Sequence, residues 1–230
     1  MELSTNNKNE RMIVLKILVV GANGQIGKHL VKQIQDSGEH MARAMIRKQE
    51  QAQYFKDLGA ETVVVDLEDE IEEITNAVEG VDAVVFTAGS GPNTGKDKTL
   101  MVDLDGAVKT IEATKAAGVK RFVMVSSFDT SRGAIQAASA SFAPYVVAKH
   151  YADEWLRSTD LDYTIVHPGL LTNQPGTGQV DAATKIERGE IPREDVAGVI
   201  YGCLEDNTTI GKEFQIVAGK SEIKQALYKL

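Results

Sequence analysis

Residues 13–27 read IVLKILVVGANGQIG, and this stretch decides the fold class. Its first half is a short run of β-branched and other apolar residues, which is typical of a buried parallel strand. Its second half spaces Gly21, Gly24 and Gly27 three residues apart. Apolar residues then recur at helical spacing until Gly38, where a helix is expected to end. A strand, a glycine turn and a helix are therefore predicted in direct succession.

Outward from this stretch, apolar strands and amphipathic helices continue to alternate along the chain. The expected strands are 13–20, 41–46, 62–65, 83–86, 121–125, 163–166 and 213–217. The expected helices are 26–38, 50–58, 71–78, 99–117, 144–158 and 193–205. Strands separated by helices of this length form βαβ units, which predicts an α/β fold with a doubly wound parallel sheet. We expect one three-layer domain over residues 13–230, because no linker divides it.

Composition and charge narrow the class further. The chain has 230 residues, of which 43% are hydrophobic, and this share is ordinary for a packed globular domain. A net charge of −8 argues against nucleic acid and anionic membranes as partners. Residues 1–12 are polar, lack the apolar run of a signal peptide and are expected to be a disordered lead-in. Together with a single cysteine, Cys203, these features predict a cytoplasmic protein.

The spacing of the three glycines has a chemical explanation. Gly21 permits the tight turn, Gly24 lets backbone amides approach a pyrophosphate, and Gly27 lets the helix lie close to the sheet. The free N–H groups of the first helical turn then bind phosphates. Since the motif lies between a strand and an amphipathic helix, it predicts a dinucleotide site, the alternative being a turn without a ligand. The loop residues expected to contact the cofactor are Gly21, Asn23, Gly24, Gln25, Ile26 and Gly27.

The end of the second strand indicates which dinucleotide is bound. Sites selective for NAD carry an acidic residue about 20 residues past the glycines, where it binds the ribose hydroxyls. Here Arg47 lies 20 residues after Gly27 and is followed by Lys48. A guanidinium can bind a 2′-phosphate in bidentate fashion, so NADP(H) is expected, with NAD(H) as the alternative. The competing interpretation is that both cations are solvated loop charges.

With these residues identified, the chain resembles the short-chain dehydrogenase/reductase superfamily. More narrowly, it resembles the atypical branch, which includes NmrA-like regulators, flavin and biliverdin reductases, and proteins described as NAD-dependent epimerases/dehydratases. The resemblance runs from residue 13 to residue 219 and includes the glycine spacing of the extended members. It implies a Rossmann fold with a small C-terminal extension on the substrate side.

The resemblance also implies further cofactor contacts. Asp66 matches the acidic residue that accepts a hydrogen bond from the adenine amino group. Residues 87–90 match the segment along the nicotinamide-side ribose, and residues 168–169 match the turn that borders the nicotinamide. The implied contacts on these segments are Asp66, Leu67, Ala88, Gly89, Ser90, Pro168 and Gly169.

Catalytic residues are implied in the same way. Ser126 and Ser127 end the fifth strand, where the family places its catalytic hydroxyl, and the sequence leaves open which of them is active. Tyr145 and Lys149 match the Tyr-x-x-x-Lys signature, and both would also contact the cofactor. Asp103 stands where the family usually has Asn. This departure puts the usual proton relay in doubt, although a carboxylate could still orient the lysine.

The tyrosine and the lysine suit proton transfer. They are four residues apart on an expected helix, so their side chains share one face. A free phenol has a pKa near 10, so the Lys149 ammonium would be needed to favour the phenolate, while a serine hydroxyl would orient the substrate oxygen. Tyr145 would then give a proton to a carbonyl, or take one from an alcohol, as hydride moves to or from nicotinamide. The alternative is a chance Tyr–Lys pair.

These features predict an NADP(H)-dependent oxidoreductase acting on a small carbonyl, alcohol or quinone-like compound. One alternative is a sugar-nucleotide epimerase or dehydratase, which the short C-terminal region disfavours. Another is a non-catalytic NADP(H)-binding redox sensor. No His, Cys, Asp or Glu group has metal-ligand spacing, and His150 is expected on a helix surface and His167 packed at a strand end. The partner is then a small-molecule substrate, and both a monomer and a homodimer stay open.

Overall fold

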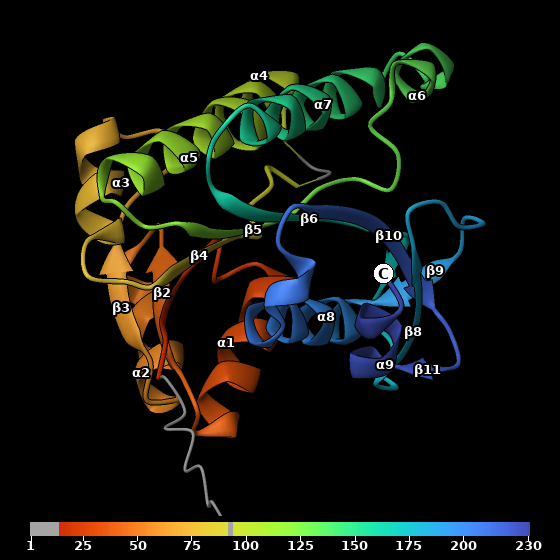
Figure 1. Cartoon of the computed structure of the whole chain (residues 1–230). Coiled ribbons are helices and arrows are strands. Elements are labelled where there is room, and N and C mark those ends of the chain that lie inside the picture. Colours follow the sequence, from red (N-terminus) through yellow and green to blue (C-terminus); the bar gives the residue numbers. More distant parts are fainter. Residues whose placement is uncertain (1–13, 92–93) are drawn as a thin grey trace, which may run out of the picture.

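The computed structural model describes residues 14–91 and 94–230, so the lead-in expected at residues 1–12 lies outside the described part. Within it, nine strands form one sheet in the order β11-β8-β10-β6-β5-β4-β1-β2-β3, with helices on both faces (Figure 1). All neighbours from β10 to β3 pair in parallel. This is the doubly wound α/β sheet that the sequence predicts.

The strands follow the expected order along the chain. Those of the main sheet are β1 Lys16–Val20, β2 Met41–Ile46, β3 Glu61–Val64, β4 Ala83–Phe86, β5 Arg121–Val125, β6 Asp162–Pro168, β8 Gln179–Ala183, β10 Lys212–Ala218 and β11 Ser221–Glu222. A separate small sheet pairs β7 Leu170–Thr172 with β9 Glu190–Pro192 in parallel.

The structure has a helix at each expected position. The helices are α1 Gln25–Ser37, η1 Gln49–Gln51, α2 Ala52–Asp57, α3 Ile71–Val78, α4 Lys96–Lys98, η2 Thr99–Asp105, α5 Gly106–Ala116, α6 Arg132–Ala137, α7 Ala143–Arg157, α8 Arg193–Glu205, η3 Asn207–Thr209 and α9 Ile223–Tyr228. Of these, α6, η3 and α9 are additional to the expected ones. In the ranges that the structure describes, no helix combines the length and apolarity needed to cross a membrane.

The sequence does not predict the short elements near the C-terminal edge of the sheet. β8 pairs antiparallel with β10 and β11, and β7 lies in a segment whose composition is typical of a plain loop. Such strands are too short to show a clear alternation of apolar and polar residues. Residues 131–141, whose small polar side chains favour a flap or a loose connection, contain α6. Its N-terminus is capped because Ser131 Oγ accepts a hydrogen bond from the Ala134 N–H.

The long helix expected at residues 99–117 begins earlier and is not uniform. It starts with α4 at Lys96, and its next seven residues, η2, are π-helical before α5 continues with α-helical geometry. π-Helical segments are rare in proteins, and those that occur inside longer helices often lie at functional sites. Asp103 lies in this segment and is fully buried.

Two apolar layers hold the sheet between its helices. Alternation along β1 sends Ile17 and Val19 into the layer shared with α1, α2 and α8, while Leu18 and Val20 enter the layer shared with α3, α5 and α7. Figure 1 shows α1 and α8 on one side of the sheet and α3, α5 and α7 on the other. Because the strands from β10 to β3 pair in parallel, their carboxyl ends all lie at one edge of the sheet.

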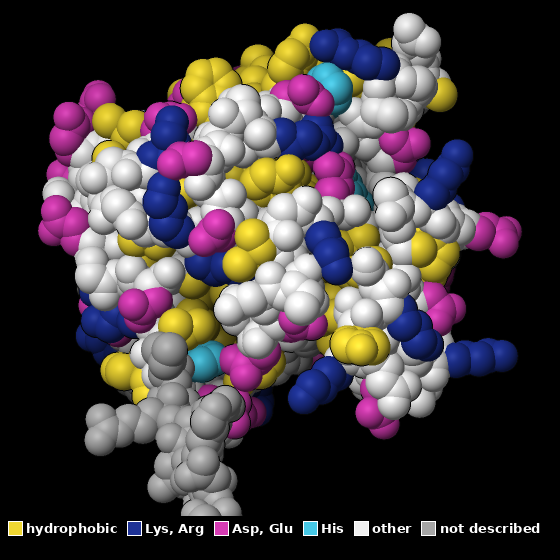
Figure 2. Space-filling model, viewed as in Figure 1, with side chains coloured by type: hydrophobic (Ala, Val, Ile, Leu, Met, Phe, Trp, Pro, Cys, Tyr) yellow, Lys and Arg dark blue, Asp and Glu magenta, His cyan; other side chains and the backbone are white. Residues whose placement is uncertain are grey.

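Charged side chains are mixed on the molecular surface. Figure 2 shows Lys and Arg side chains interspersed with Asp and Glu side chains over the face in view. On that face the acidic side chains are not gathered in one area.

Candidate functional site

A cavity of about 180 Å³ opens at the carboxyl edge, where the strand order reverses between β1 and β4. Ligands of doubly wound sheets bind at this position. Seven of the residues expected to bind a dinucleotide lie in its wall. The lining residues are Val20, Gly21, Gly24, Met45, Arg47, Val65, Asp66, Leu67, Thr87, Ala88, Gly89 and Val102.

The glycine turn is built by close backbone packing. Gly21 has a φ of 80°, and a Cβ placed on it would lie 2.6 Å from the backbone of Ala88. A Cβ on Gly27 would lie 2.4 Å from the carbonyl oxygen of Gly21. At the start of α1, Gly24 is the N-cap residue and provides no side-chain cap. The amides of the first helical turn are thus open to an anion.

The remaining loop residues take different positions. Asn23 is half-buried, and Gln25 is exposed on the first turn of α1. Ile26 is 8% exposed and packs in the core with α8, so of its groups only the backbone amide suits a phosphate.

The two cations after β2 are not equivalent. Arg47 is exposed, lines the cavity and forms no ion pair with any residue of the described ranges. Lys48 is also exposed, but its Nζ lies 3.9 Å from Glu50 Oε1, and it is not part of the cavity wall. Asp66 lies in the same wall as Arg47, and its Oδ1 accepts a hydrogen bond of 3.1 Å from the Glu68 N–H. The geometry therefore assigns the cavity cation to Arg47.

Lys149 lies beside this cavity and is surrounded by several buried polar atoms. It lies on α7 with only 2% of its surface exposed, and its Nζ is 3.6 Å from Asp103 Oδ1. The same ammonium lies 3.4 Å from the Val125 carbonyl oxygen and 5.9 Å from the ring centre of Tyr145. The other oxygen of Asp103 accepts a hydrogen bond of 3.0 Å from the Ser90 N–H. Asp103 thus orients Lys149, as the sequence suggested a carboxylate could.

Opposing effects act on the pKa of Tyr145. Burial raises the pKa of its phenol, and the Asp103 carboxylate raises it further. The Lys149 ammonium and a hydrogen bond with the Ser127 side chain act to lower the same pKa, but they do not overcome burial. Lys149 thus favours the phenolate as expected, but burial leaves the pKa of Tyr145 above its ordinary value in the protein without cofactor. At neutral pH the phenol keeps its proton.

The structure separates the roles of the two serines. Ser126 is buried, and its hydroxyl donates a hydrogen bond of 2.8 Å to Asp153 Oδ2, away from the tyrosine. Ser127 is half-buried, and its side chain acts to lower the pKa of Tyr145. The hydroxyl of Ser126 is thus occupied by Asp153, which leaves Ser127 as the better placed candidate.

Pro168 ends β6 and Gly169 follows it, and neither residue lies in the cavity wall. Pro168 pairs in register with Ile216 of β10, and the Gly169 N–H donates a hydrogen bond of 2.8 Å to the carbonyl of the same residue. A Cβ on Gly169 would lie 2.3 Å from the Gly189 carbonyl oxygen. Packing alone explains a glycine at this position.

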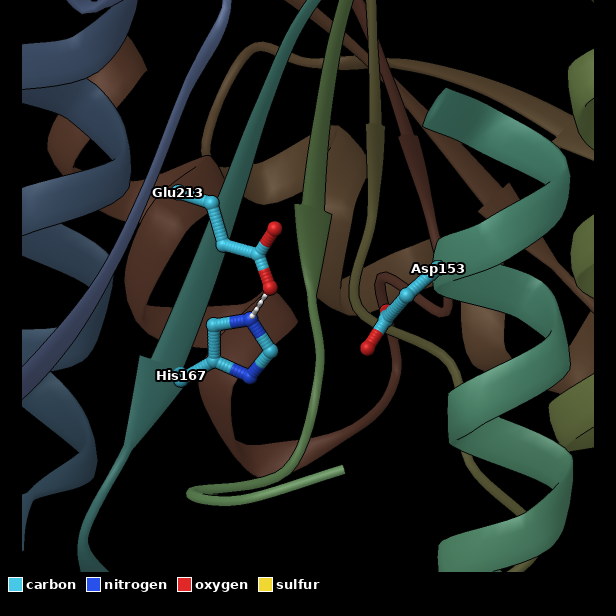
Figure 3. A group of neighbouring side chains, drawn as sticks. All are labelled: Asp153, His167 and Glu213. Carbon is cyan, nitrogen blue, oxygen red and sulfur yellow. Dashed lines mark hydrogen bonds and ion pairs between the residues drawn. The ribbon is translucent and has the colours of Figure 1, made fainter. Parts of the chain in front are cut away.

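Three ionisable residues beside the serines escape prediction from the sequence. Asp153, His167 and Glu213 come from α7, β6 and β10 and lie close together (Figure 3). Only Asp153 carries a signal, since it follows Lys149 by one helical turn. His150, expected on a helix surface, is buried instead, and its Nδ1 is 2.8 Å from the Thr130 carbonyl oxygen.

A second, larger hollow of about 340 Å³ lies over the start of α1 and of α8. Its basic side chains already have partners. Lys32 pairs with Asp36, Lys28 lies over the Tyr54 ring, and Arg193 donates to Asn173 Oδ1. These contacts reduce the donors that the hollow can offer to a ligand.

Comparisons with known proteins agree with this geometry. A family model described as NAD(P)H-binding matches residues 21–207. The "uncharacterized sugar epimerase YhfK" of Bacillus subtilis is 49% identical over 216 residues, which are 94% of this chain and 100% of that protein. An NAD-dependent epimerase/dehydratase-like protein from Bacillus halodurans, of solved structure, is 40% identical with a TM-score of 0.88, covering 94% of this chain and 100% of the other.

A relative with a different kind of name is the photosystem II assembly factor Ycf39 of Synechocystis. It is 32% identical over 218 residues, which are 90% of this chain and 64% of that protein. The names of these relatives therefore point to different activities. The family model, in contrast, describes only NAD(P)H binding, and it matches most of the chain. The chain belongs to the family of NAD(P)H-binding Rossmann-fold proteins.

Proposed function

We propose that this protein is an NADP(H)-dependent oxidoreductase that reduces a small carbonyl or quinone-like compound, or oxidises the corresponding alcohol. The observation that carries the proposal is the buried group at the carboxyl edge. Tyr145 holds a protonated phenol beside Ser127, with Lys149 and Asp103 behind it. A neutral phenol next to a buried ammonium is suited to give a proton to an oxygen that gains negative charge.

The residues of the cavity fit the dinucleotide. Arg47 would bind the 2′-phosphate, Asp66 would accept the adenine amino group, and the amides that follow Gly24 would bind the pyrophosphate. Bound NADPH supplies the hydride for the substrate carbon. Because Arg47 has no ionic partner among the described residues, its guanidinium is free for a phosphate. This supports NADP(H) over NAD(H).

The catalytic residues would divide the work at the substrate oxygen. Ser127 would donate a hydrogen bond to that oxygen and so fix its position. Tyr145 would transfer its proton to the same oxygen as the carbon is reduced, which leaves a phenolate. The Lys149 ammonium would stabilise this phenolate, and Asp103 would hold the ammonium in place. The carbon thus gains hydride, the oxygen gains the proton, and solvent reprotonates the tyrosine.

Two other functions have some support. The name of the YhfK relative favours an epimerase, and the name of Ycf39 favours a role without catalysis. The chain after β6 forms the sheet edge and helices α8 and α9, and this leaves little for the substrate domain of a sugar-nucleotide enzyme. The intact Ser127, Tyr145 and Lys149 favour catalysis over sensing. The proposal includes a cytoplasmic location and a small-molecule partner.

The test is a fluorescence titration with NADPH and NADH, followed by a screen of aldehydes, ketones and quinones at the absorbance band of NADPH. We expect tighter binding of NADPH and its oxidation with at least one class of carbonyl. Tight NADPH binding without turnover of any compound would favour the redox sensor. Equal affinity for both dinucleotides would remove the NADP(H) assignment.

A further inference from the structure

The segment that carries Ser127, residues 126–130, is held by side chains from three elements. Asp153 of α7 accepts hydrogen bonds from Ser126 Oγ at 2.8 Å and from Thr130 Oγ1 at 2.7 Å. His167 of β6 donates from Nδ1 to the Ser127 carbonyl oxygen. Gln215 of β10 donates to the Phe128 carbonyl at 2.8 Å. These hydrogen bonds fix the position of the segment relative to α7, β6 and β10.

His167 is held in turn by an ion network. Its Nε2 donates to Glu213 Oε1 at 2.7 Å, and Arg157 donates to both oxygens of Glu213 at 2.9 Å and 2.6 Å. Both partners of the imidazole are oxygen acceptors, so both ring nitrogens carry a proton. Burial lowers the pKa of His167, but Glu213, Asp153 and the Ser127 carbonyl together raise it. His167 is therefore a buried imidazolium with a fixed ring orientation.

The same three residues also have the spacing of a metal site. Asp153, His167 and Glu213 each place one donor atom within 4.8 Å of the others (Figure 3). However, both imidazole nitrogens are already used as donors, and Arg157 already neutralises Glu213. The two carboxylates are balanced by the imidazolium and the guanidinium, so a divalent cation would add excess positive charge. The cluster is better explained as an ion network that fixes its neighbours.

We propose that Asp153 and His167 are positioning residues, which hold residues 126–130 so that the Ser127 hydroxyl faces Tyr145, with Glu213 and Arg157 keeping His167 in place. This inference rests on the proposed function, because it gives Ser127 its task. The contact runs through the Ser127 carbonyl, one residue from the buried Ser126 anchor. A displacement of the backbone by about 1 Å is enough to reduce a catalytic rate by about 100-fold.

A matched pair of variants at His167 tests the proposal. In His167→Asn the side-chain amide replaces the Nδ1 donor to the Ser127 carbonyl. In His167→Gln the longer side chain replaces the Nε2 donor to Glu213 and loses the bond to Ser127. We expect His167→Gln to lower kcat by about 10- to 100-fold with little change in KM or NADPH affinity. We expect His167→Asn to restore kcat to within a few-fold of the native protein.

A second readout needs no substrate. Free 3,5-difluorotyrosine is more acidic than tyrosine, so its phenol placed at position 145 ionises at a lower pH than that of Tyr145, and ¹⁹F NMR follows its titration. Since the Ser127 side chain acts to lower the Tyr145 pKa, Ser127→Ala should raise the midpoint. His167→Gln should raise it in the same direction, whereas His167→Asn should leave it near the native value. Thermal unfolding of each variant confirms that it is folded.

The outcomes are distinguishable. If Ser127→Ala shifts the midpoint but His167→Gln does not, the positioning role is wrong, whatever the substrate screen shows. The positioning role is also wrong if both His167 variants shift the midpoint equally and lose equal thermal stability, since that is a merely structural role. If the midpoint shifts as expected but no carbonyl is reduced, the proposed function fails and the positioning of Ser127 stands. Asp153→Ala, which removes the acceptor of two hydroxyls, should act like His167→Gln.

Discussion

Asp103 changes the chemistry of the site by one atom relative to the Asn of the resembled family. An amide is neutral, whereas this buried carboxylate lies 3.6 Å from Lys149 Nζ and acts to raise the Tyr145 pKa. Two opposite charges act on one phenol, the ammonium favouring the phenolate and the carboxylate the phenol. Burial contributes most to the raised pKa of Tyr145, and Asp103 adds to it against Lys149, which favours Tyr145 as an acid.

The Asp103→Asn variant tests this balance. Removal of the carboxylate charge should lower the pKa of Tyr145, because Asp103 acts to raise it. For the reduction, which needs the protonated phenol, the decline of kcat/KM at high pH should begin at a lower pH than in the native protein. The pH profile of kcat/KM is the measurement. An unchanged or upward-shifted decline would show that the charge of Asp103 does not act on Tyr145.

The preference for NADPH over NADH is expected to depend on one residue, Arg47. Arg47→Glu should weaken NADPH binding by about 1.5–3 kcal/mol, the value of a hydrogen bond to a charged group, and NADH binding much less. Lys48→Glu is the matched control, because Lys48 is exposed, lies near Glu50 and is not in the cavity wall. Fluorescence titration measures both. Equal losses for NADPH and NADH, or equal effects of the two variants, would remove the assignment of Arg47.

At the scale of elements, the sequence predicts what is regular and local. Strands β2, β4 and β5 and helices α3 and α8 have the expected bounds, because each has a strong apolar period ended by polar or glycine residues. The short strands β7, β9 and β11 lack enough residues for a period. The π-helical geometry of η2 could not be predicted either, because it depends on the packing of Asp103 beside Ser90 and Lys149.

The glycine turn is an element whose packing can be tested directly. In Gly27→Ala the new Cβ would lie 2.4 Å from the Gly21 carbonyl oxygen, so α1 must move from the sheet. We expect a loss of about 1–3 kcal/mol in unfolding free energy, with weaker binding of both dinucleotides. The control is Gly133→Ala in α6, where the nearest atom is 3.7 Å away and no loss is expected. Urea unfolding measures the stability of both variants, and NADPH titration measures their cofactor binding. A Gly27→Ala protein as stable as the control would contradict the packing argument.

At the scale of the whole molecule, the site depends on strand order. The parallel sheet brings the turns after β1, β2, β3, β4 and β5 to one edge, which is why seven of the residues predicted to contact the cofactor line one cavity. The network of Asp153, His167 and Glu213 could not be predicted from the sequence. Its members come from three elements that meet only because β10 pairs with β6 and α7 covers this part of the sheet. No local pattern in the sequence encodes such a meeting.

This network also ties global stability to pH. Burial acts to raise the pKa of Glu213, but hydrogen bonds from His167 and Arg157 outweigh it and lower the pKa to about 2, from an ordinary value of 4.5. A carboxyl with a lowered pKa stabilises the folded state above its ordinary value, and this contribution is lost as the pH falls toward the folded pKa. The native protein should therefore lose its advantage in unfolding free energy over Glu213→Gln between about pH 5 and about pH 2. Urea unfolding across this range is the measurement, and a constant difference would contradict the role of Glu213.

The central claim, that Tyr145 gives the proton during an NADPH-dependent reduction, is tested most directly by single-turnover hydride transfer in Tyr145→Phe. The substitution keeps the ring and removes the hydroxyl, so NADPH binding through the glycine turn and Arg47 should survive. With NADPH saturating and a carbonyl substrate from the screen, the rate of NADPH oxidation should fall by about 10²–10⁴-fold, the usual contribution of a positioned general acid. A variant that transfers hydride as fast as the native protein would show that Tyr145 is not the acid.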